Sequence, residues 1–296
     1  MPAPATYRCL PPELADRLAA YGITVRRPVE GPLQGLHRSP HFGASVEFAE
    51  YRAYTPGDPV GLVDWAVYAR SDRYVVRRFV EETNLRAFVL VDVSESLAFR
   101  GAGPGPKLAY ATRLAAAVLY VLLRQGDSGG LVLFRAGERR WLAPTGSFEG
   151  LRPMLRALDA ARARGGTDVE GALGEAAERL TGRSLVVVIS DLLEAPTRVL
   201  RGIQRLRHDG HEVTVFQVLD PRELRLPSGT VAELRELETG RRMAVDLDEL
   251  REAYAREVQR FLEELRQGCH ASGADYHLAQ TTAGVEQVLA RRAVRP

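Results

Sequence analysis

The chain has 296 residues, of which 45% are hydrophobic and 26% are charged, a balance typical of a globular protein with a buried core. The formal net charge of +2 gives no broad electrostatic footprint for nucleic acid, which usually needs a concentrated basic face. With two distant cysteines, no apolar run of the ~18 residues that a membrane span needs, and no signal-peptide layout, the sequence predicts a cytoplasmic protein.

Residues 1–85 are predicted to form an irregular, β-leaning N-terminal segment. A short helix is expected over Pro12–Tyr21, and two extended stretches over Val46–Tyr54 and Tyr74–Val80. Pro56-Gly57-Asp58 is typical of a turn between them. The segment holds too few apolar residues to predict an independent core.

Residues 86–296 are predicted to form one α/β domain, because strand and helix patterns alternate along them. Alternation of this kind predicts a doubly wound, mostly parallel, Rossmann-type sheet with helices on both faces. A long amphipathic helix is expected to follow Asp246. The other expected elements are strands at Arg86–Val93, Gly129–Phe134, Arg140–Ala143, Ser184–Ser190, Glu212–Leu219 and Asp275–Ala279, and helices at Lys107–Arg124, Phe148–Arg162, Asp168–Leu180, Pro196–His208 and Val285–Arg292.

Three loops that follow predicted strands or open predicted helices carry oxygen side chains. In the run Asp92-Val93-Ser94-Glu95-Ser96, alternation along an extended backbone places Asp92, Ser94 and Ser96 on one side. Gly165-Gly166-Thr167-Asp168 opens a helix, and Ser190-Asp191 ends a strand. Ligands of parallel sheets collect at the carboxyl ends of the strands, and hard oxygen ligands suit Mg²⁺. The first run alone is equally typical of a turn.

Together, the three loops resemble the metal ion-dependent adhesion site of von Willebrand factor A domains, over roughly Arg86 to Arg292. The resemblance implies Ser94, Ser96 and Thr167 as direct hydroxyl ligands of Mg²⁺, with Mn²⁺ as the alternative ion. It implies Asp92 and Asp191 as ligands directly or through water. Two carboxylates with neutral hydroxyls would leave a coordination position for an acidic side chain of a partner.

The upstream segment Glu47–Asp58, followed by Asp64-Trp65 and Ala69-Arg70, resembles the signature of the domain-of-unknown-function 58 family. These bacterial proteins join such a segment to a von Willebrand factor A-like domain, and the resemblance implies a MoxR-type AAA+ ATPase as partner. Gly61 departs from the family, which usually has a basic residue before the Asp-Trp pair, and Leu97 replaces the usual Met.

Three local features have simpler interpretations. Asp168 could be a metal ligand, but a cap for the helix that it begins is favoured. Asp58, Asp64 and Trp65 are expected to form a structural latch between the N-terminal segment and the main domain rather than a catalytic group. Gly101–Gly105 lacks the Gly-Lys-Ser/Thr ending of a phosphate loop, so we expect a flexible rim beside the metal site.

The function expected from the sequence is a non-enzymatic binding module that captures an acidic side chain through Mg²⁺ together with the ATPase. One alternative is a Mg²⁺-dependent phosphoryl-transfer hydrolase. Hydrolases that form an aspartyl-phosphate commonly have a second acidic residue two positions after the nucleophilic aspartate, where this chain has Ser94. Lys107 is the single lysine of the sequence, and no lysine is expected near the later loops. The other alternative is a structural scaffold whose site is empty.

Overall fold

The chain folds into two compact units in a computed structural model, a large unit of Met1–Arg26 and Leu85–Pro296 and a small unit of Arg27–Asn84. This division differs from the predicted segment 1–85, because helix α1 (Pro12–Leu18) buries Leu14 and Leu18 in the core of the large unit. The structure describes residues 7–19, 46–56, 58, 61, 63–81, 85–226, 231–235 and 242–293.

The small unit contains an antiparallel pair of strands, β1 (Val46–Ala53) and β2 (Val75–Glu81), and the helix α2 (Trp65–Ser71). Asp64 caps α2, since its carboxylate accepts hydrogen bonds from the first backbone N–H groups of the helix. The extended stretches predicted here are confirmed. Gly57 and the side chains of Glu47–Glu50, which belong to the family signature, lie outside the described part.

Asp58 and Asp64 both accept hydrogen bonds within the small unit. The guanidinium of Arg52 donates to both carboxylate oxygens of Asp58, at 2.7 and 2.8 Å. The hydroxyl of Tyr51 donates to Asp64 at 3.0 Å. The two carboxylates therefore have a structural role in this unit, and the predicted latch onto the large domain stays a prediction.

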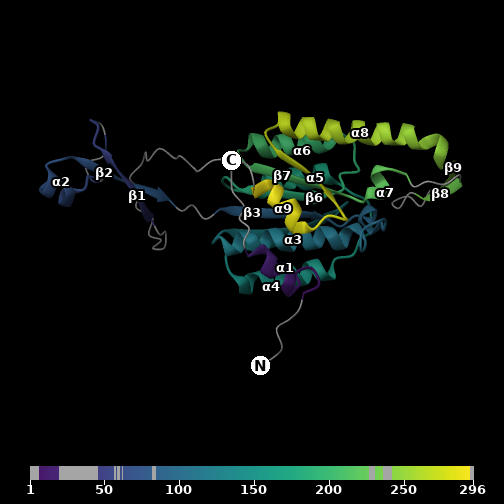
Figure 1. Cartoon of the computed structure of the whole chain (residues 1–296), viewed down its shortest axis with the longest axis horizontal. Helices are drawn as coiled ribbons and strands as arrows, with labels where there is room; N and C mark the ends of the chain where they lie inside the picture. Colours follow the sequence, from purple (N-terminus) through teal and green to yellow (C-terminus); the bar gives the residue numbers. More distant parts are fainter. Residues whose placement is uncertain are drawn as a thin grey trace, which may run out of the picture. The chain divides into compact units, whose positions relative to one another are not determined.

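A six-stranded sheet forms the centre of the large unit, in the order β10-β7-β6-β3-β4-β5 (Figure 1). All neighbours are parallel except β4 and β5, so the predicted doubly wound, mostly parallel sheet is confirmed. Its central strands are apolar along their length because both faces are covered. The strands are β3 (Arg86–Asp92), β4 (Ser128–Arg135), β5 (Glu138–Thr145), β6 (Leu185–Ser190), β7 (Glu212–Leu219) and β10 (Asp275–Gln280).

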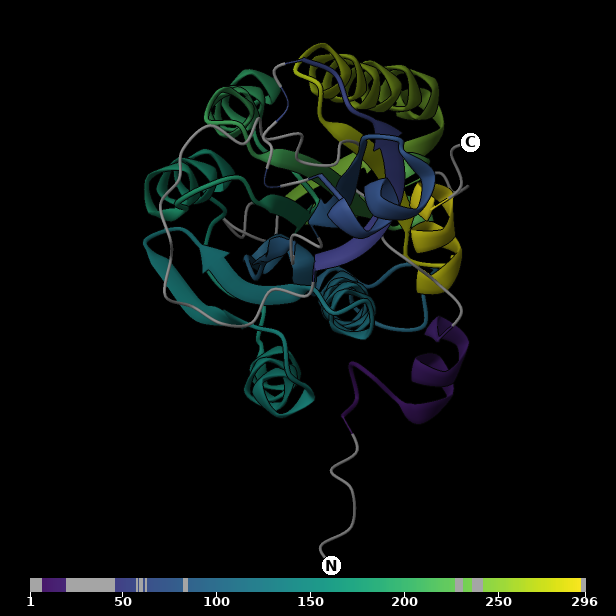
Figure 2. The same ribbon diagram turned by 90° about the vertical axis from the view of Figure 1, so that its left-hand side faces the viewer.

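Helices cover both faces of this sheet (Figure 2). α1, α3, α4 and α9 pack on one face, and α5, α6 and α8 pack on the other, each with its own apolar cluster. Among the described helices, none combines the length and apolar character needed to cross a bilayer. The bounds are α3 (Lys107–Arg124), α4 (Phe148–Ala160), α5 (Val169–Arg179), α6 (Pro196–His208), α8 (Leu247–Ala271) and α9 (Val285–Ala293).

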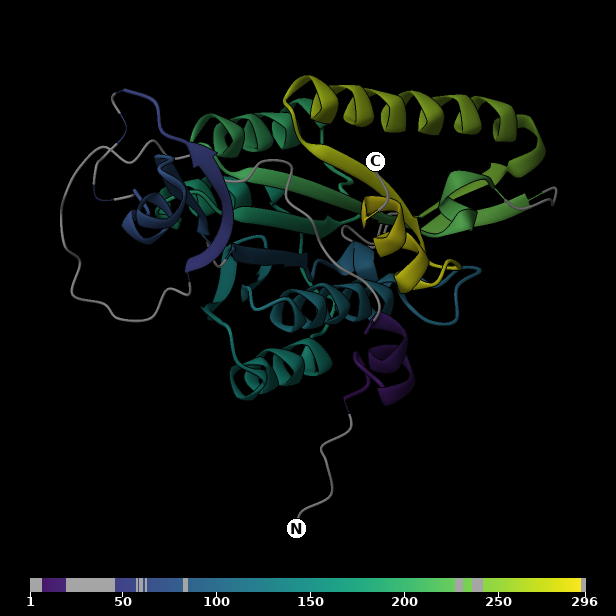
Figure 3. The same ribbon diagram turned by 60° about the vertical axis from the view of Figure 1, so that its left-hand side comes forward.

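Shorter elements lie at the carboxyl end of the sheet. A 3₁₀ turn, Glu95–Ala98, follows β3, and the one-turn helix α7 (Pro221–Leu224) follows β7. The antiparallel pair β8 (Val231–Arg235) and β9 (Arg242–Asp246) extends beyond α7 at the same end (Figure 3). After β3 the chain adds β4 and β5 on one side of β3, and then adds β6, β7 and β10 on the other side. The strand order therefore reverses between β3 and β6, and a ligand crevice is expected at this point.

Candidate functional site

The predicted oxygen side chains lie at this reversal point. Asp92 is the last residue of β3, and Ser190 and Asp191 end the neighbouring strand β6. Thr167 lies just before α5, and its hydroxyl donates to Asp92 Oδ2 at 3.0 Å. Adjacent parallel strands therefore bring together groups that are far apart in sequence, as the strand-end argument predicts.

Asp92 lies at the centre of the cluster and is fully buried. Its Oδ1 accepts a hydrogen bond from the backbone N–H of Ser94 at 2.8 Å. Its Oδ2 accepts the hydroxyl of Ser190 at 2.6 Å, in addition to that of Thr167. The hydroxyl oxygens of Ser94 and Ser96 are 3.1 Å apart. The structure thus gathers the predicted residues of the first two loops and adds Ser190, which was not predicted as a site residue.

Burial dominates the electrostatics of Asp92. Loss of water, followed by repulsion from the charge of Asp191, raises the pKa of Asp92 to about 6, against the opposing hydrogen bonds from Ser190 and Ser94. The hydroxyl and amide donors around it are all neutral. Among the described residues, no cationic side chain lies within ion-pair distance of this carboxylate.

Asp191 has a cationic partner that sequence reasoning missed. Lys107 Nζ donates to Asp191 Oδ2 at 2.8 Å and to Glu223 Oε1 at 2.7 Å, and its side chain is fully buried. The expectation that no lysine lies near the later loops is therefore wrong. Lys107 is the first residue of α3, the helix after the first strand of the sheet, and folding brings that helix start back to the end of β6.

The two carboxylates that contact Lys107 stabilise its protonated form. Burial alone would lower the pKa of Lys107, but the negative charges of Asp191 and Glu223 outweigh it and raise that pKa above its usual range. Burial raises the pKa of Glu223, and the charge of Lys107 opposes that rise. The ammonium therefore lies between two carboxylates as a permanent internal cation.

Asp220, which directly follows β7, anchors the glycine-rich loop. Its carboxylate accepts the backbone N–H groups of Ala102 and Gly103 at 2.8 and 2.9 Å, and the hydroxyl of Thr281 at 2.6 Å. Burial alone would raise the pKa of Asp220, but these hydrogen bonds outweigh it and hold the pKa below its usual range. A buried carboxylate therefore anchors the middle of this loop, and the flexibility predicted for Gly101–Gly105 stays a prediction.

A sequence signal for these additional residues exists. Asp220 and Glu223 form a capping box, in which the Asp220 side chain caps α7 and the Glu223 side chain accepts the Asp220 backbone N–H at 2.8 Å. An Asp-x-x-Glu pattern directly after a predicted strand marks both residues as part of the carboxyl end of the sheet. Their contact with Lys107 has no comparable local signal.

Asp168 is a helix cap, as favoured from the sequence. Its Oδ1 accepts the backbone N–H of Gly171 at 3.1 Å at the start of α5. Its other oxygen pairs with the guanidinium of Arg139. Both interactions are structural, and the cluster around Asp92 is complete without this residue.

The donor set of the cluster fits a hard divalent cation. In the described part of the chain, no group of three or more His, Cys, Asp or Glu side chains is placed to hold a metal. The strand ends offer instead two carboxylates, Asp92 and Asp191, and the hydroxyls of Ser94, Ser96 and Thr167. Neutral and anionic oxygens that leave room for water are the set that Mg²⁺ accepts.

A family model and two relatives match this chain. The family model described as "Protein of unknown function DUF58" matches residues 50–264. The uncharacterized protein Rv1480 of Mycobacterium tuberculosis is 33% identical over 252 residues, which cover 83% of this chain and 78% of the relative. The uncharacterized protein Mb1516 of Mycobacterium bovis matches with the same identity and coverage.

Solved structures with a related arrangement have low sequence identity. The conserved hypothetical protein BatB from Bacteroides thetaiotaomicron is 18% identical, with a TM-score of 0.46, over 71% of this chain and 98% of that one. The SpRpn10 VWA domain is 12% identical, with a TM-score of 0.42, over 71% of this chain and 95% of that one. The order of the sheet, and not these likenesses, establishes the fold of this protein.

The buried ion pairs of Lys107 predict a large stability effect. We expect Lys107→Met to lower the free energy of unfolding by about 3–5 kcal/mol, because Asp191 and Glu223 lose their cation while staying buried. Urea unfolding in the presence of a chelator measures the loss. Arg124→Met, at the exposed end of the same helix, is the matched control and is expected to stay within about 0.5 kcal/mol of the parent.

A double-mutant cycle separates this pairing from a general packing loss. Lys107→Met combined with Asp191→Asn is expected to cost less than the sum of the single changes, by about 0.5–3 kcal/mol. Strictly additive losses would show that the two side chains do not stabilise each other.

The anchored loop predicts a steric effect at one glycine. A Cβ at Gly101 would lie 1.9 Å from Asp220 Oδ1, so Gly101→Ala displaces the carboxylate from its amide donors. We expect a loss of about 1–3 kcal/mol in thermal or urea unfolding. Gly105→Ala in the same loop is the control, because its Cβ would meet only Ala109 Cβ at an ordinary 3.8 Å. Equal losses in both variants would contradict the anchoring role.

Proposed function

The chain belongs to the DUF58 family, and we propose that it is a non-enzymatic, cytoplasmic binding module that captures an acidic side chain of a protein partner through Mg²⁺ at the strand-end cluster. One observation carries the proposal. A buried carboxylate, Asp92, is surrounded by hydroxyls and has no cationic partner among the described residues, whereas its neighbour Asp191 has one.

The residues that would hold the ion are Ser94, Ser96 and Thr167 through their hydroxyls, with Asp92 and Asp191 binding directly or through water. When bound, Mg²⁺ would supply an open coordination position for an anionic oxygen. Asp92 would provide negative charge and orient the hydroxyl of Thr167, which it already contacts. Lys107 would neutralise part of the charge of Asp191, which favours completion of the coordination by a carboxylate from the partner.

The geometry gives less support to a phosphoryl-transfer enzyme. A nucleophilic aspartate must reach its substrate, but Asp92 is fully buried and both of its oxygens accept hydrogen bonds. Lys107 contacts Asp191 and Glu223, so its charge is already matched by two carboxylates. These contacts favour a binding role over covalent chemistry.

A MoxR-type AAA+ ATPase, or the client that it remodels, is the partner that we propose. The support for this partner is the resemblance of the segment Glu47–Arg70 to the family signature. Capture of a co-expressed ATPase by the tagged full chain, with and without chelator, tests it. Capture that needs Mg²⁺ supports the proposal, and capture that is unchanged by chelator would remove the metal from the interaction.

Direct titration of metal tests the site itself. Mg²⁺ or Mn²⁺ added to the full chain is expected to give saturable heat, with Asp92→Asn binding about 10- to 100-fold more weakly because the cluster loses its central charge. Asp127→Asn is the control, since this carboxylate caps the start of the sheet by accepting the backbone N–H of Leu85. Equal binding by the parent and Asp92→Asn would sink the proposed site and leave a structural scaffold.

The raised pKa of Asp92 predicts that metal binding weakens in mild acid. With a pKa of about 6, Asp92 is ionised at pH 7.5 but mostly protonated at pH 5, and a cation must then displace the proton. We expect Mn²⁺ affinity to be about tenfold lower at pH 5 than at pH 7.5. Calorimetry at the two pH values measures the change, and an affinity that rises toward pH 5 would contradict the assignment.

A further inference from the structure

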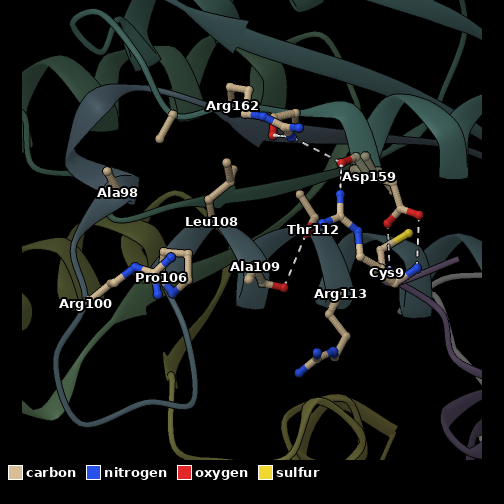
Figure 4. A pocket seen from close by; sticks show the side chains of 14 residues that line it. Cys9, Ala98, Arg100, Pro106, Leu108, Ala109, Thr112, Arg113, Asp159 and Arg162 are labelled. Atoms are coloured by element: carbon tan, nitrogen blue, oxygen red, sulfur yellow. Dashed lines mark hydrogen bonds between the residues drawn. The ribbon is translucent and has the colours of Figure 1, made fainter.

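The large unit contains a cavity of about 550 Å³ whose lining is rich in arginine. It lies between the residues that precede α1, the start of α3 and the end of α4 (Figure 4). Arg8, Arg100, Arg113 and Arg162 contribute to its wall, together with a single carboxylate, Asp159. Figure 4 shows Arg100, Arg113 and Arg162 on three sides of the view, each from a different part of the chain.

None of these four guanidinium groups has a carboxylate within ion-pair distance in the described part of the protein. Several other arginines of the large unit do pair with carboxylates. Arg183 pairs with Glu212 at 2.6 Å, and Arg205 pairs with Glu178 at 3.0 Å. The four arginines of the cavity wall therefore lack a carboxylate partner among the described residues, which leaves their positive charge uncompensated.

The one carboxylate of the wall is already used by backbone groups. Asp159 Oδ2 accepts the N–H of Arg8 at 3.0 Å, and its Oδ1 accepts the N–H of Cys9 at 2.9 Å. The guanidinium of Arg8 donates instead to the backbone carbonyl of Asp159, at 2.8 Å. Burial raises the pKa of the Cys9 thiol, so the sulfur adds no negative charge. The cavity keeps an excess of positive charge.

Arg113 provides a second, independent observation that points to an anionic ligand. Its Nε is buried and has no hydrogen-bond acceptor within the described protein. A buried donor without an acceptor is rare in folded proteins and calls for a ligand or ordered water. Arg113 also borders the neighbouring cavity beside α9.

We propose that this cavity is a binding site for a small phosphate-bearing anion of the diphosphate class. Guanidinium forks match phosphate oxygens with paired hydrogen bonds, and several arginines in one cavity wall suit a ligand with more than one negative charge. The volume lies in the range of small-molecule sites. Ala98, Pro106 and Leu108 give the wall an aliphatic part, which would accommodate a short alkyl group rather than stack on a ring.

The proposed anion site is separate from the strand-end cluster and does not depend on a metal. Asp92 and Asp191 do not line the cavity. Binding can therefore be measured in the presence of a chelator, where phosphate cannot attach to a metal ion. If no metal binds at the strand-end cluster, the proposed anion site is not contradicted. If no anion binds in the cavity, the proposed metal site is not contradicted.

Calorimetric titration of the full chain with pyrophosphate, at low salt and with chelator, tests the proposal. We expect saturable binding with a Kd below about 1 mM. An alkyl diphosphate serves as a second probe, and tighter binding than pyrophosphate would support an organic ester as the ligand. Malonate is the carboxylate control, and malonate binding as tightly as pyrophosphate would overturn the phosphate assignment.

Substitutions locate the binding. Arg113→Gln and the double variant Arg100→Gln/Arg162→Gln are each expected to weaken pyrophosphate binding at least about tenfold, as expected for loss of charged hydrogen bonds. Arg124→Gln, on the same helix as Arg113 but outside the cavity, is expected to bind like the parent. Because Arg100 and Arg162 are exposed, the double variant tests the site even if Arg113→Gln is unstable. No saturable heat, or an equal loss in Arg124→Gln, would overturn the proposal.

Discussion

The burial of two carboxylates, Asp92 and Asp191, at the ends of adjacent strands is the constraint on which this end of the protein depends. Buried charges need compensation, and the two receive it in different ways. Among the described residues, Asp191 pairs with the ammonium of Lys107, whereas Asp92 accepts hydrogen bonds from hydroxyls and a backbone amide alone. Because of this difference, Asp92 favours the binding of a further cation. The proposed Mg²⁺ site rests on this property of Asp92.

The compensation also determines how the surrounding loops are arranged. Lys107 connects the start of α3 to the end of β6 and to α7, since its ammonium bridges Asp191 and Glu223. The chain uses arginine almost everywhere for positive charge, and its single lysine occupies this buried position. A compact ammonium fits between two carboxylates without the space and the five directed donors of a guanidinium. Asp220 completes the arrangement by fixing the glycine-rich loop.

The segment that follows β3 borders two regions of opposite charge. Ser94 and Ser96 belong to the carboxylate cluster, while Ala98 and Arg100 line the arginine-rich cavity. The short 3₁₀ turn Glu95–Ala98 contains one residue of each region, Ser96 and Ala98.

Sequence alone determined the elements of the large unit and the first part of the site. Apolar runs and helical spacing predicted the parallel sheet, because these patterns depend on near neighbours in the chain. The short spacing of Asp92, Ser94 and Ser96 predicted that they lie together, and they do, although β3 ends at Asp92 and Ser96 lies in the 3₁₀ turn that follows. Tertiary structure alone decided the partner of Asp191, which is 84 positions from Lys107, and the anchoring of residues 102–103 by Asp220. It also placed α1 on the large unit. Such contacts depend on how whole helices and loops pack in space. No local sequence pattern indicates which buried charged side chains will form a pair.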